Sequence, residues 1–211
     1  MADLLTLAKA GSAAYSEKKS KFLGYARPVD SEAAAAAFID EIKKRHWDAR
    51  HTVYAYVIGA NGEIQRSTDD GEPAGTAGRP VLEIIKGEGL TGTAIVVSRY
   101  FGGVLLGTGG LVRAYGKTAK LAVADSAKIR KVEGKKVAVC ADYDLIGKIE
   151  HFLLQKGFQI ENIEYKNNAV LYCIIKKTEV DTFFALLARE FQTKLDCVVM
   201  EEEHWFAEPA D

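Results

Sequence analysis

The sequence predicts an α+β protein made of two domains, and its length, charge and glycine distribution support this prediction. With 211 residues, the chain is long enough for one large domain or two small ones. Residues 1–130 carry 18 Lys and Arg against 14 Asp and Glu, whereas residues 131–211 carry 10 against 15. Of the 19 glycines, 12 lie between Gly71 and Gly116. We therefore predict one domain at 1–130 and another at 131–211.

The first domain is predicted to begin with a strand followed by a helix. The strand runs from Ser20 to Val29, and Asp30 or Ser31 then offers a side-chain oxygen to cap a helix. An alanine-rich stretch favours that helix from Glu32 to about Arg45.

A hairpin is predicted next. Thr52 to Ile58 is rich in β-branched and aromatic residues, which favours a strand. Asn61-Gly62 matches a tight turn that needs positive φ, so Glu63 to Ser67 is expected as the return strand. Residues 69–80 are expected to form a loop.

The rest of the first domain contains two further helices and a strand. Pro80 is suited to the first turn of a helix at Val81 to Lys86. The apolar run Thr93 to Arg99 predicts a strand, followed by a glycine-rich loop over Tyr100 to Gly109. Apolar residues at helical spacing predict a helix over Gly110 to Ser126.

The second domain is predicted to have the order β-α-β-β-α-β, which is typical of ferredoxin-like domains. Its strands are expected at Lys135–Tyr143, Phe158–Tyr165, Ala169–Lys176 and Leu195–Phe206, with a turn at Asn167-Asn168. Asp144 is expected to cap a helix over Leu145–Lys156 that stops at Gly157, and Thr178 to cap a helix reaching about Phe191.

Composition limits the function classes. The net charge of −1 excludes a globally basic nucleic-acid-binding protein, and the net +4 of residues 1–130 restricts any anion-binding role to that part. No apolar run is long enough for a membrane helix, and Met1–Gly11 lacks the basic start of a secretory signal. Cys140, Cys173 and Cys197 are far apart and form no CxxC, so we expect no disulfide framework, no metal site, no cofactor and a cytoplasmic location.

An acidic loop is the strongest local feature. Residues 69–80, DDGEPAGTAGRP, contain three carboxylates, three glycines, two prolines and an arginine. As a plain surface loop it would need no function, since Gly, Pro and Asp are common turn residues. As a site, its glycines would let a ligand approach the backbone, and its carboxylates would need a cation or an arginine.

A glycine- and aromatic-rich segment is the second feature. Residues 98–113, SRYFGGVLLGTGGLVR, place two aromatic residues and five glycines between two arginines. Such a mixture can stack bases and hold phosphates, or it can close the core while its glycines permit tight packing. The segment Gly110–Thr118 is not a Walker A loop, because five residues separate its glycines where four are required. His46, Asp48 and His51 lack the spacing of a metal site on one helical face.

Residues 69–80 and residues 99–115, RYFGGVLLGTGGLVRAY, resemble the signatures of the YigZ/IMPACT family, as do SKFLG at residues 20–24 and ARH at 49–51. The resemblance covers the whole chain and implies a first domain similar to the second domain of a small-subunit ribosomal protein. It implies a second domain similar to the last domain of elongation factor G. Val53 departs from the family, whose members often carry Cys there, so thiol chemistry is not expected at that position.

The resemblance also implies a link to translation, because the eukaryotic relative is a translation regulator that binds an activator of an amino-acid-starvation kinase. Our first hypothesis is therefore a binding protein that contacts RNA, the ribosome or a translation protein. The alternative is an enzyme, a hydrolase or phosphate-handling protein, in which Asp69, Asp70 and Glu72 act with Arg99 or Arg113. The sequence names no nucleophile or substrate. The candidate site residues are Asp69, Asp70, Glu72, Gly75, Thr76, Arg79, Arg99, Tyr100, Phe101, Arg113 and His51.

Overall fold

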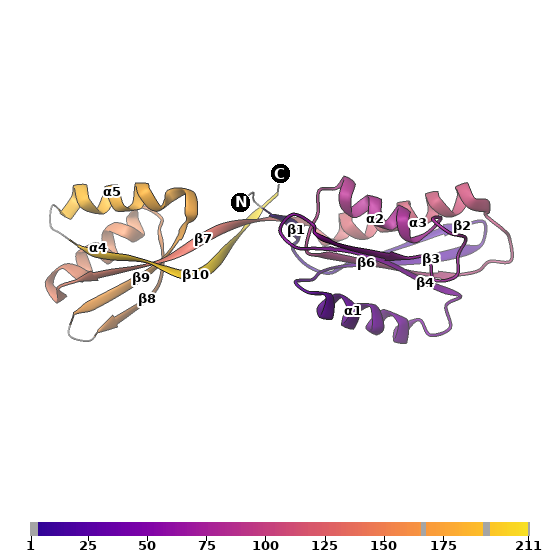
Figure 1. Ribbon diagram of the computed structural model, residues 1–211, viewed down its shortest axis with the longest axis horizontal. Helices are drawn as coiled ribbons and strands as arrows, with labels where there is room; N and C mark the ends of the chain where they lie inside the picture. The colour runs from indigo at the N-terminus through magenta and orange to yellow at the C-terminus, as the bar shows by residue number, and fades with distance from the viewer. Residues whose placement is uncertain (1–3, 166–167, 192–194, 211) are drawn as a thin grey trace. The chain divides into compact units, whose positions relative to one another are not determined.

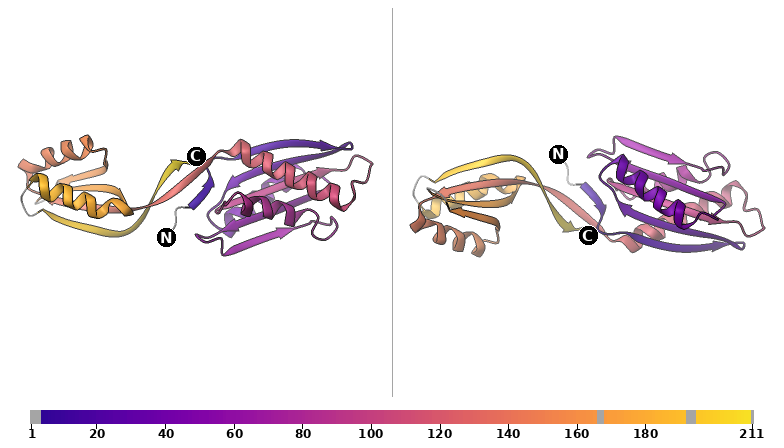
Figure 2. Two further views of the ribbon diagram at one scale, coloured as in Figure 1. Left: turned by 90° about the horizontal axis from the view of Figure 1, so that it is seen from above. Right: turned by 90° about the horizontal axis from the view of Figure 1, so that it is seen from below.

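The structure is a computed structural model that describes residues 4–165, 168–191 and 195–210. It divides into two compact units, a first unit at Leu4–Arg130 and a second unit at Lys131–Glu208. Each unit contains a sheet covered by helices, as Figures 1 and 2 show, which confirms the α+β fold class.

The first unit is built on an antiparallel five-stranded sheet with the order β2-β3-β6-β4-β5. Its strands are β2 (Gly11–Glu17), β3 (Ser20–Pro28), β6 (Thr93–Tyr100), β4 (His51–Ile58) and β5 (Ile64–Thr68). The central strand β6 pairs with β3 on one side and β4 on the other, so these three strands bring sequence-distant segments together.

Helices cover both faces of this sheet (Figure 1). Helix α1 (Glu32–Arg45) packs on one face, and α2 (Gly78–Gly87) and α3 (Gly107–Ser126) pack on the other. Because both faces are covered, β6 is buried from Thr93 through Arg99. The core under α2 and α3 includes Phe22, Ile95 and Tyr115, whereas the core under α1 includes Phe38 and Val96.

The hairpin between β2 and β3 is not predicted by the sequence. Its turn residues Lys18 and Lys19 have φ values of 44° and 69°, and lysine is not a usual residue in that left-handed region. The turn therefore lacks the glycine or asparagine signal from which a hairpin is normally recognised.

The hairpin between β4 and β5 has the predicted strands but another turn. Asn61 is not among the residues with positive φ, so the expected two-residue turn at Asn61-Gly62 is wrong. Five residues, 59–63, form the connection, and the positive φ values are taken by Gly59 and Gly62. The amide N–H of Gly62 donates to the Gly59 carbonyl, which closes this longer loop.

The predicted bounds of α1 are correct, and so are the predicted ends of α3 at Ser126 and of α5 at Phe191 (Val180–Phe191). Ser31 caps α1, since its hydroxyl accepts from the Ala34 N–H. Helix α2 begins at Gly78 and α3 at Gly107, in each case earlier than predicted. Pro80 fits inside the first turn of α2 because the N–H groups of a first turn have no helical partner.

The second unit has the predicted ferredoxin-like order. It contains β7 (Lys128–Ala141), α4 (Tyr143–Gln155), β8 (Gln159–Tyr165), β9 (Ala169–Lys176), α5 (Val180–Phe191) and β10 (Asp196–Pro209). The strand order in its sheet is β7-β9-β8, with β10 also paired with β7. The short strand β1 (Leu4–Leu7), which belongs to the first unit, also pairs with β7. Helices α4 and α5 share one core with the sheet.

Three local predictions in this unit differ from the structure or lie outside it. Asp142, not Asp144, is the residue before α4. Thr178 lies within a 3-10 turn, Lys177–Glu179, that leads directly into α5, so it is not the cap. Residue 167 of the expected Asn167-Asn168 turn lies outside the described residues. The predicted helix stop is confirmed, because Gly157 follows α4 with a φ of 81°. Within the described chain, no helix is both long and apolar enough to cross a membrane.

Candidate functional site

Asp69 organises the acidic loop that joins β5 to α2. Its carboxylate accepts the N–H groups of Gly75, Ala77 and Gly78 at 2.8–3.0 Å, so the loop folds back onto its first residue. Burial alone would raise the pKa of Asp69, but the three backbone N–H groups outweigh burial and lower it. Asp69 therefore holds the loop and the start of α2 in place.

Two hydrogen bonds join Asp70 to His51 and Thr52, the first residues of β4. The Asp70 carboxylate accepts the N–H of Thr52 at 2.6 Å, and Asp70 itself has a φ of 44°. The Nδ1 atom of His51 lies 2.7 Å from the Asp70 carbonyl oxygen. Because a carbonyl can only accept, Nδ1 carries the proton and donates it, which fixes the His51 tautomer.

Glu72 and Arg99 form a buried ion pair. The Arg99 guanidinium donates to Glu72 Oε1 at 2.6 Å, and their side chains are 5% and 3% exposed respectively. The hydroxyl of Tyr115 donates to the same oxygen at 2.8 Å. Burial raises the pKa of Tyr115, and the charge and hydrogen bond of Glu72 raise it further, so its hydroxyl stays protonated.

Arg99 is enclosed by aromatic rings. Its guanidinium lies 5.5 Å from the ring centres of both Phe22 and Phe101, and Nη2 also contacts the Ser20 hydroxyl at 3.4 Å. The residue is only 4% exposed. Arg99 is therefore a core residue of the site and cannot meet a ligand phosphate at the surface.

The other candidate residues of the acidic loop differ in accessibility. Thr76 is buried, and its hydroxyl donates to the Pro73 carbonyl at 2.6 Å. Gly75 is exposed with a φ of 74°, and Arg79 is exposed in the first turn of α2. Of the loop's charged side chains, Arg79 points outward, whereas Asp69 and Glu72 are occupied by donors of the protein itself.

Tyr100 belongs to a chain of hydrogen bonds at the end of α1. Its hydroxyl donates to Asp48 at 2.9 Å and lies 3.0 Å from His46 Nδ1. It therefore accepts from Nδ1–H, and His46 Nε2 accepts from the Tyr25 hydroxyl at 2.8 Å. Burial lowers the pKa of His46, and the positive charge of Arg45 adds to this, so the imidazole is held neutral.

Exposed aromatic and apolar side chains lie on the two segments that follow α1 and β6, and these segments meet at Arg50. The backbone N–H of Arg50 donates to the Arg99 carbonyl, and the Arg50 guanidinium lies 5.5 Å from the Phe101 ring centre. Trp47 is 83% exposed and Leu105 is 82% exposed. We call the exposed side chains of these two segments, Trp47, Arg50, Phe101, Val104 and Leu105, the motif-end surface.

The eleven sequence-predicted residues differ in burial, and His51, Asp69 and Tyr100 are half-buried. Glu72, Arg99 and Thr76 are buried, whereas Phe101, Arg79 and Arg113 are exposed. Sequence reasoning did not single out Tyr115, which reads as an ordinary core position of a helix. It also missed Trp47 and Arg50, although a tryptophan in the polar segment after a helix is a signal that could have found the surface.

No group of three or more His, Cys, Asp or Glu side chains within residues 4–165, 168–191 and 195–210 could hold a metal ion. His46 and His51 are instead hydrogen-bonded to Tyr25, Tyr100 and the Asp70 backbone.

Comparison with known proteins identifies the family. The Impact N-terminal domain matches residues 18–123, and a domain of unknown function, DUF1949, matches residues 139–189. The IMPACT family member YvyE of Bacillus subtilis (strain 168) is 40% identical over 178 residues, covering 84% of this chain and 82% of that protein. The chain belongs to the IMPACT family.

Other relatives agree with this assignment. The IMPACT family member YigZ of Escherichia coli (strain K12) is 37% identical over 187 residues, covering 88% of this chain and 92% of that protein. Protein IMPACT of Xenopus laevis is 34% identical over 97 residues, which are 44% of this chain and 30% of that protein. A crystal structure described as a hypothetical protein has 35% identity and a TM-score of 0.64, covering 96% of this chain and 99% of that one.

Proposed function

We propose that this IMPACT family protein is a regulatory binding protein linked to translation, and that its first domain, residues 1–130, contacts RNA through the motif-end surface. The observation that carries the proposal is the contact of Arg50 with the exposed ring of Phe101, on two segments that also carry the exposed Trp47 and Leu105. Exposed aromatic rings stack on unpaired bases, and arginines beside them attract the phosphate backbone. Residues 131–211 carry a net charge of −5, so we assign no phosphate-binding role to that part.

The hydrogen bonds of the acidic loop support binding over catalysis. Asp69 and Asp70 accept backbone N–H groups, and Glu72 accepts from Arg99 and Tyr115. A general base must be free to take a proton from a substrate. Each of these carboxylates is already used to hold the loop, so the enzyme hypothesis has less support than the binding hypothesis.

The neighbourhood of the motif-end surface adds positive charge. Lys21 pairs with Tyr100 across β3 and β6, and the Gly102 N–H donates to the Ser20 hydroxyl beside the Lys18-Lys19 turn. These lysines are exposed and approach the surface from the β2–β3 hairpin. Cations arranged beside aromatic rings are expected to make RNA binding weaken as salt increases.

The test is binding of a fluorescein-labelled single-stranded RNA and of purified ribosomes, measured at about 50 and 200 mM salt. Phe101→Ala and Trp47→Ala are each expected to weaken binding by about 1–3 kcal/mol, the usual value of one stacked base. Leu121→Ala is the matched control, because Leu121 is exposed to the same extent as Phe101 but lies on α3, outside the motif-end surface.

The outcomes separate the classes of partner. RNA binding that is unchanged in Phe101→Ala and Trp47→Ala removes the motif-end surface from the proposal. Ribosome binding that these variants abolish, without any binding of free RNA at low salt, would replace RNA by a ribosomal or translation protein as the partner.

A further inference from the structure

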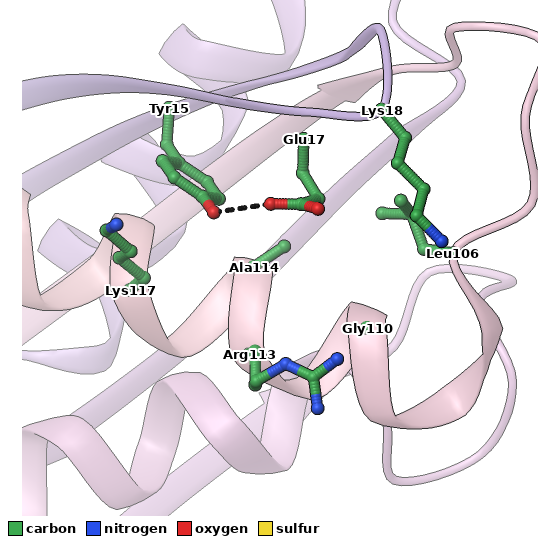
Figure 3. A pocket seen from close by; sticks show the side chains of 8 residues that line it. All are labelled: Tyr15, Glu17, Lys18, Leu106, Gly110, Arg113, Ala114 and Lys117. Atoms are coloured by element: carbon green, nitrogen blue, oxygen red, sulfur yellow. Dashed lines mark hydrogen bonds between the residues drawn. The ribbon is translucent and has the colours of Figure 1, made fainter.

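A pocket of about 250 Å³ lies between the β2–β3 hairpin and the first turns of α3 (Figure 3). Three of its eight lining residues are cationic and one is a carboxylate, which gives the pocket a net charge of +2. The residues are Tyr15, Glu17, Lys18, Leu106, Gly110, Arg113, Ala114 and Lys117. None of them belongs to the motif-end surface.

The carboxylate of this pocket is already occupied. The Tyr15 hydroxyl donates to Glu17 Oε2 at 2.7 Å, as Figure 3 shows. That hydrogen bond raises the pKa of Tyr15, burial adds to the increase, and the charge of Arg113 opposes it. Lys117 lies 4.6 Å from the centre of the Tyr15 ring.

Among the described residues, none of the three cations has an anionic partner, and Lys117 has only its contact with the Tyr15 ring. Among the residues that the structure describes, Arg113 and Lys18 form no ion pair and no side-chain hydrogen bond. The terminal nitrogen of Arg113 instead lies beside the glycine-rich first turn of α3, where a Cβ on Gly109 would be 3.6 Å from it. This differs from Arg99, whose charge is balanced by Glu72.

Charge, donors and size together indicate the ligand class. A guanidinium fork matches two oxygens of a phosphate, and lysines supply further charge. The excess of two positive charges balances the two negative charges of a phosphomonoester at neutral pH. The volume is below the ~300–1,000 Å³ of pockets that enclose drug-sized ligands, so it suits a phosphate group with a short attachment.

We propose that this pocket binds a phosphomonoester dianion through Arg113, Lys18 and Lys117. Two sources present the same group, a small phosphorylated metabolite and the 5′-phosphate end of an RNA. Glu17 and Tyr15 close the side of the pocket next to β2, and Leu106 and Ala114 give it an apolar wall.

The test is isothermal titration calorimetry of the full chain with inorganic phosphate, adenosine 5′-monophosphate and adenosine. Both phosphate-bearing probes are expected to bind and adenosine is not. Arg113→Ala is expected to weaken binding at least about tenfold, the usual effect of losing hydrogen bonds to a charged group. Glu17→Gln keeps an acceptor for Tyr15 but removes a negative charge, so it is expected to strengthen binding.

Lys120→Ala serves as the matched control, because it removes one positive charge from an exposed position of α3 outside the pocket. It is expected to change binding less than twofold, and the melting temperature of each variant checks that the fold is intact. The proposal is overturned if neither phosphate nor the monophosphate binds, or if Arg113→Ala and Lys120→Ala have equal effects.

The two sources are distinguished with RNAs of one sequence carrying a 5′-phosphate or a 5′-hydroxyl. A preference for the 5′-phosphate that Arg113→Ala removes supports the RNA end, whereas tight monophosphate binding without that preference supports a metabolite. Phe101→Ala tests the motif-end surface separately. If this variant loses RNA binding but still binds phosphate, both proposals are supported. If the variant keeps RNA binding, the motif-end surface is wrong, and if the unsubstituted chain does not bind phosphate, the pocket is wrong.

Discussion

Arg99 and Glu72 lie 27 residues apart in the sequence, yet their side chains meet at 2.6 Å inside the first unit. Tyr115, from α3, donates to the same carboxylate oxygen. One carboxylate thus connects the acidic loop to a central strand and to a helix. Glu72 and Arg99, one charge from each motif, are therefore used to build the site and are not presented to a partner.

Breaking this ion pair is expected to be costly. Arg99→Met leaves Glu72 buried without its cation, which should lower the free energy of unfolding by about 3–5 kcal/mol. Urea denaturation measures the change. The double variant Arg99→Met with Glu72→Leu should lose less than Arg99→Met alone, because no charge is left unpaired.

Glu83→Gln provides the comparison for this prediction. It removes an exposed pair with Lys86, which is expected to contribute at most about 0.5 kcal/mol. Equal effects of Arg99→Met and Glu83→Gln would contradict a structural role for the buried pair.

Asp69→Asn is expected to loosen the acidic loop and to alter acid stability. The folded pKa of Asp69 lies below its ordinary value of 3.8, so its contribution is present above about pH 4 and is lost as pH falls through the folded pKa. Thermal melts from pH 7 to pH 2 should show a smaller loss of stability at acid pH for Asp69→Asn. Asp40→Asn, on the exposed face of α1, is the control, and its melting temperature should fall between pH 7 and pH 2 as much as that of the unsubstituted chain.

His46→Gln is expected to change the pH dependence near neutrality. Because the folded pKa of His46 is lower than its ordinary value of 6.5, the unfolded chain binds more protons, and stability falls as pH decreases below about 6.5. His46→Gln should reduce the difference in melting temperature between pH 7 and pH 5. His151→Gln, at an exposed position of α4, is the control, and an identical change in both variants would rule out this role.

Two glycine substitutions, one in the second motif and one farther along α3, should have opposite effects. A Cβ on Gly102 would lie 2.0 Å from the Lys19 carbonyl carbon, so Gly102→Ala must displace the β2–β3 turn and is expected to cost about 1–3 kcal/mol. Gly116 has open space inside α3, so Gly116→Ala should stabilise the helix by roughly 0.5–1 kcal/mol. Chemical denaturation of both variants tests whether close packing explains Gly102.

The sequence was a good guide to elements whose signals are local. Ser31 and the alanines that follow define α1, and Gly157 ends α4 because glycine adopts positive φ easily. The Lys18-Lys19 turn was not predicted, because lysine gives no local sign of the left-handed conformation that both residues adopt. Prediction therefore succeeded where residue type and backbone conformation agree.

The candidate site was harder to predict because its chemistry depends on distant partners. Glu72 reads as a free carboxylate until Arg99 and Tyr115 are placed next to it. The pocket beside α3 combines Tyr15 and Glu17 with residues almost one hundred positions later, and no local pattern relates them. Only the strand pairing and helix packing bring these groups together.

The bond from the Gly102 N–H to the Ser20 hydroxyl spans 82 residues, and it has a consequence for the order of folding. Contacts between such distant residues form only after the intervening chain has closed, so they belong to the late stages of assembly. The two motifs are therefore expected to acquire their geometry together, when the sheet is complete. A peptide that carries residues 69–115 alone lacks Ser20 and the β2–β3 hairpin, and it would not reproduce the site in miniature.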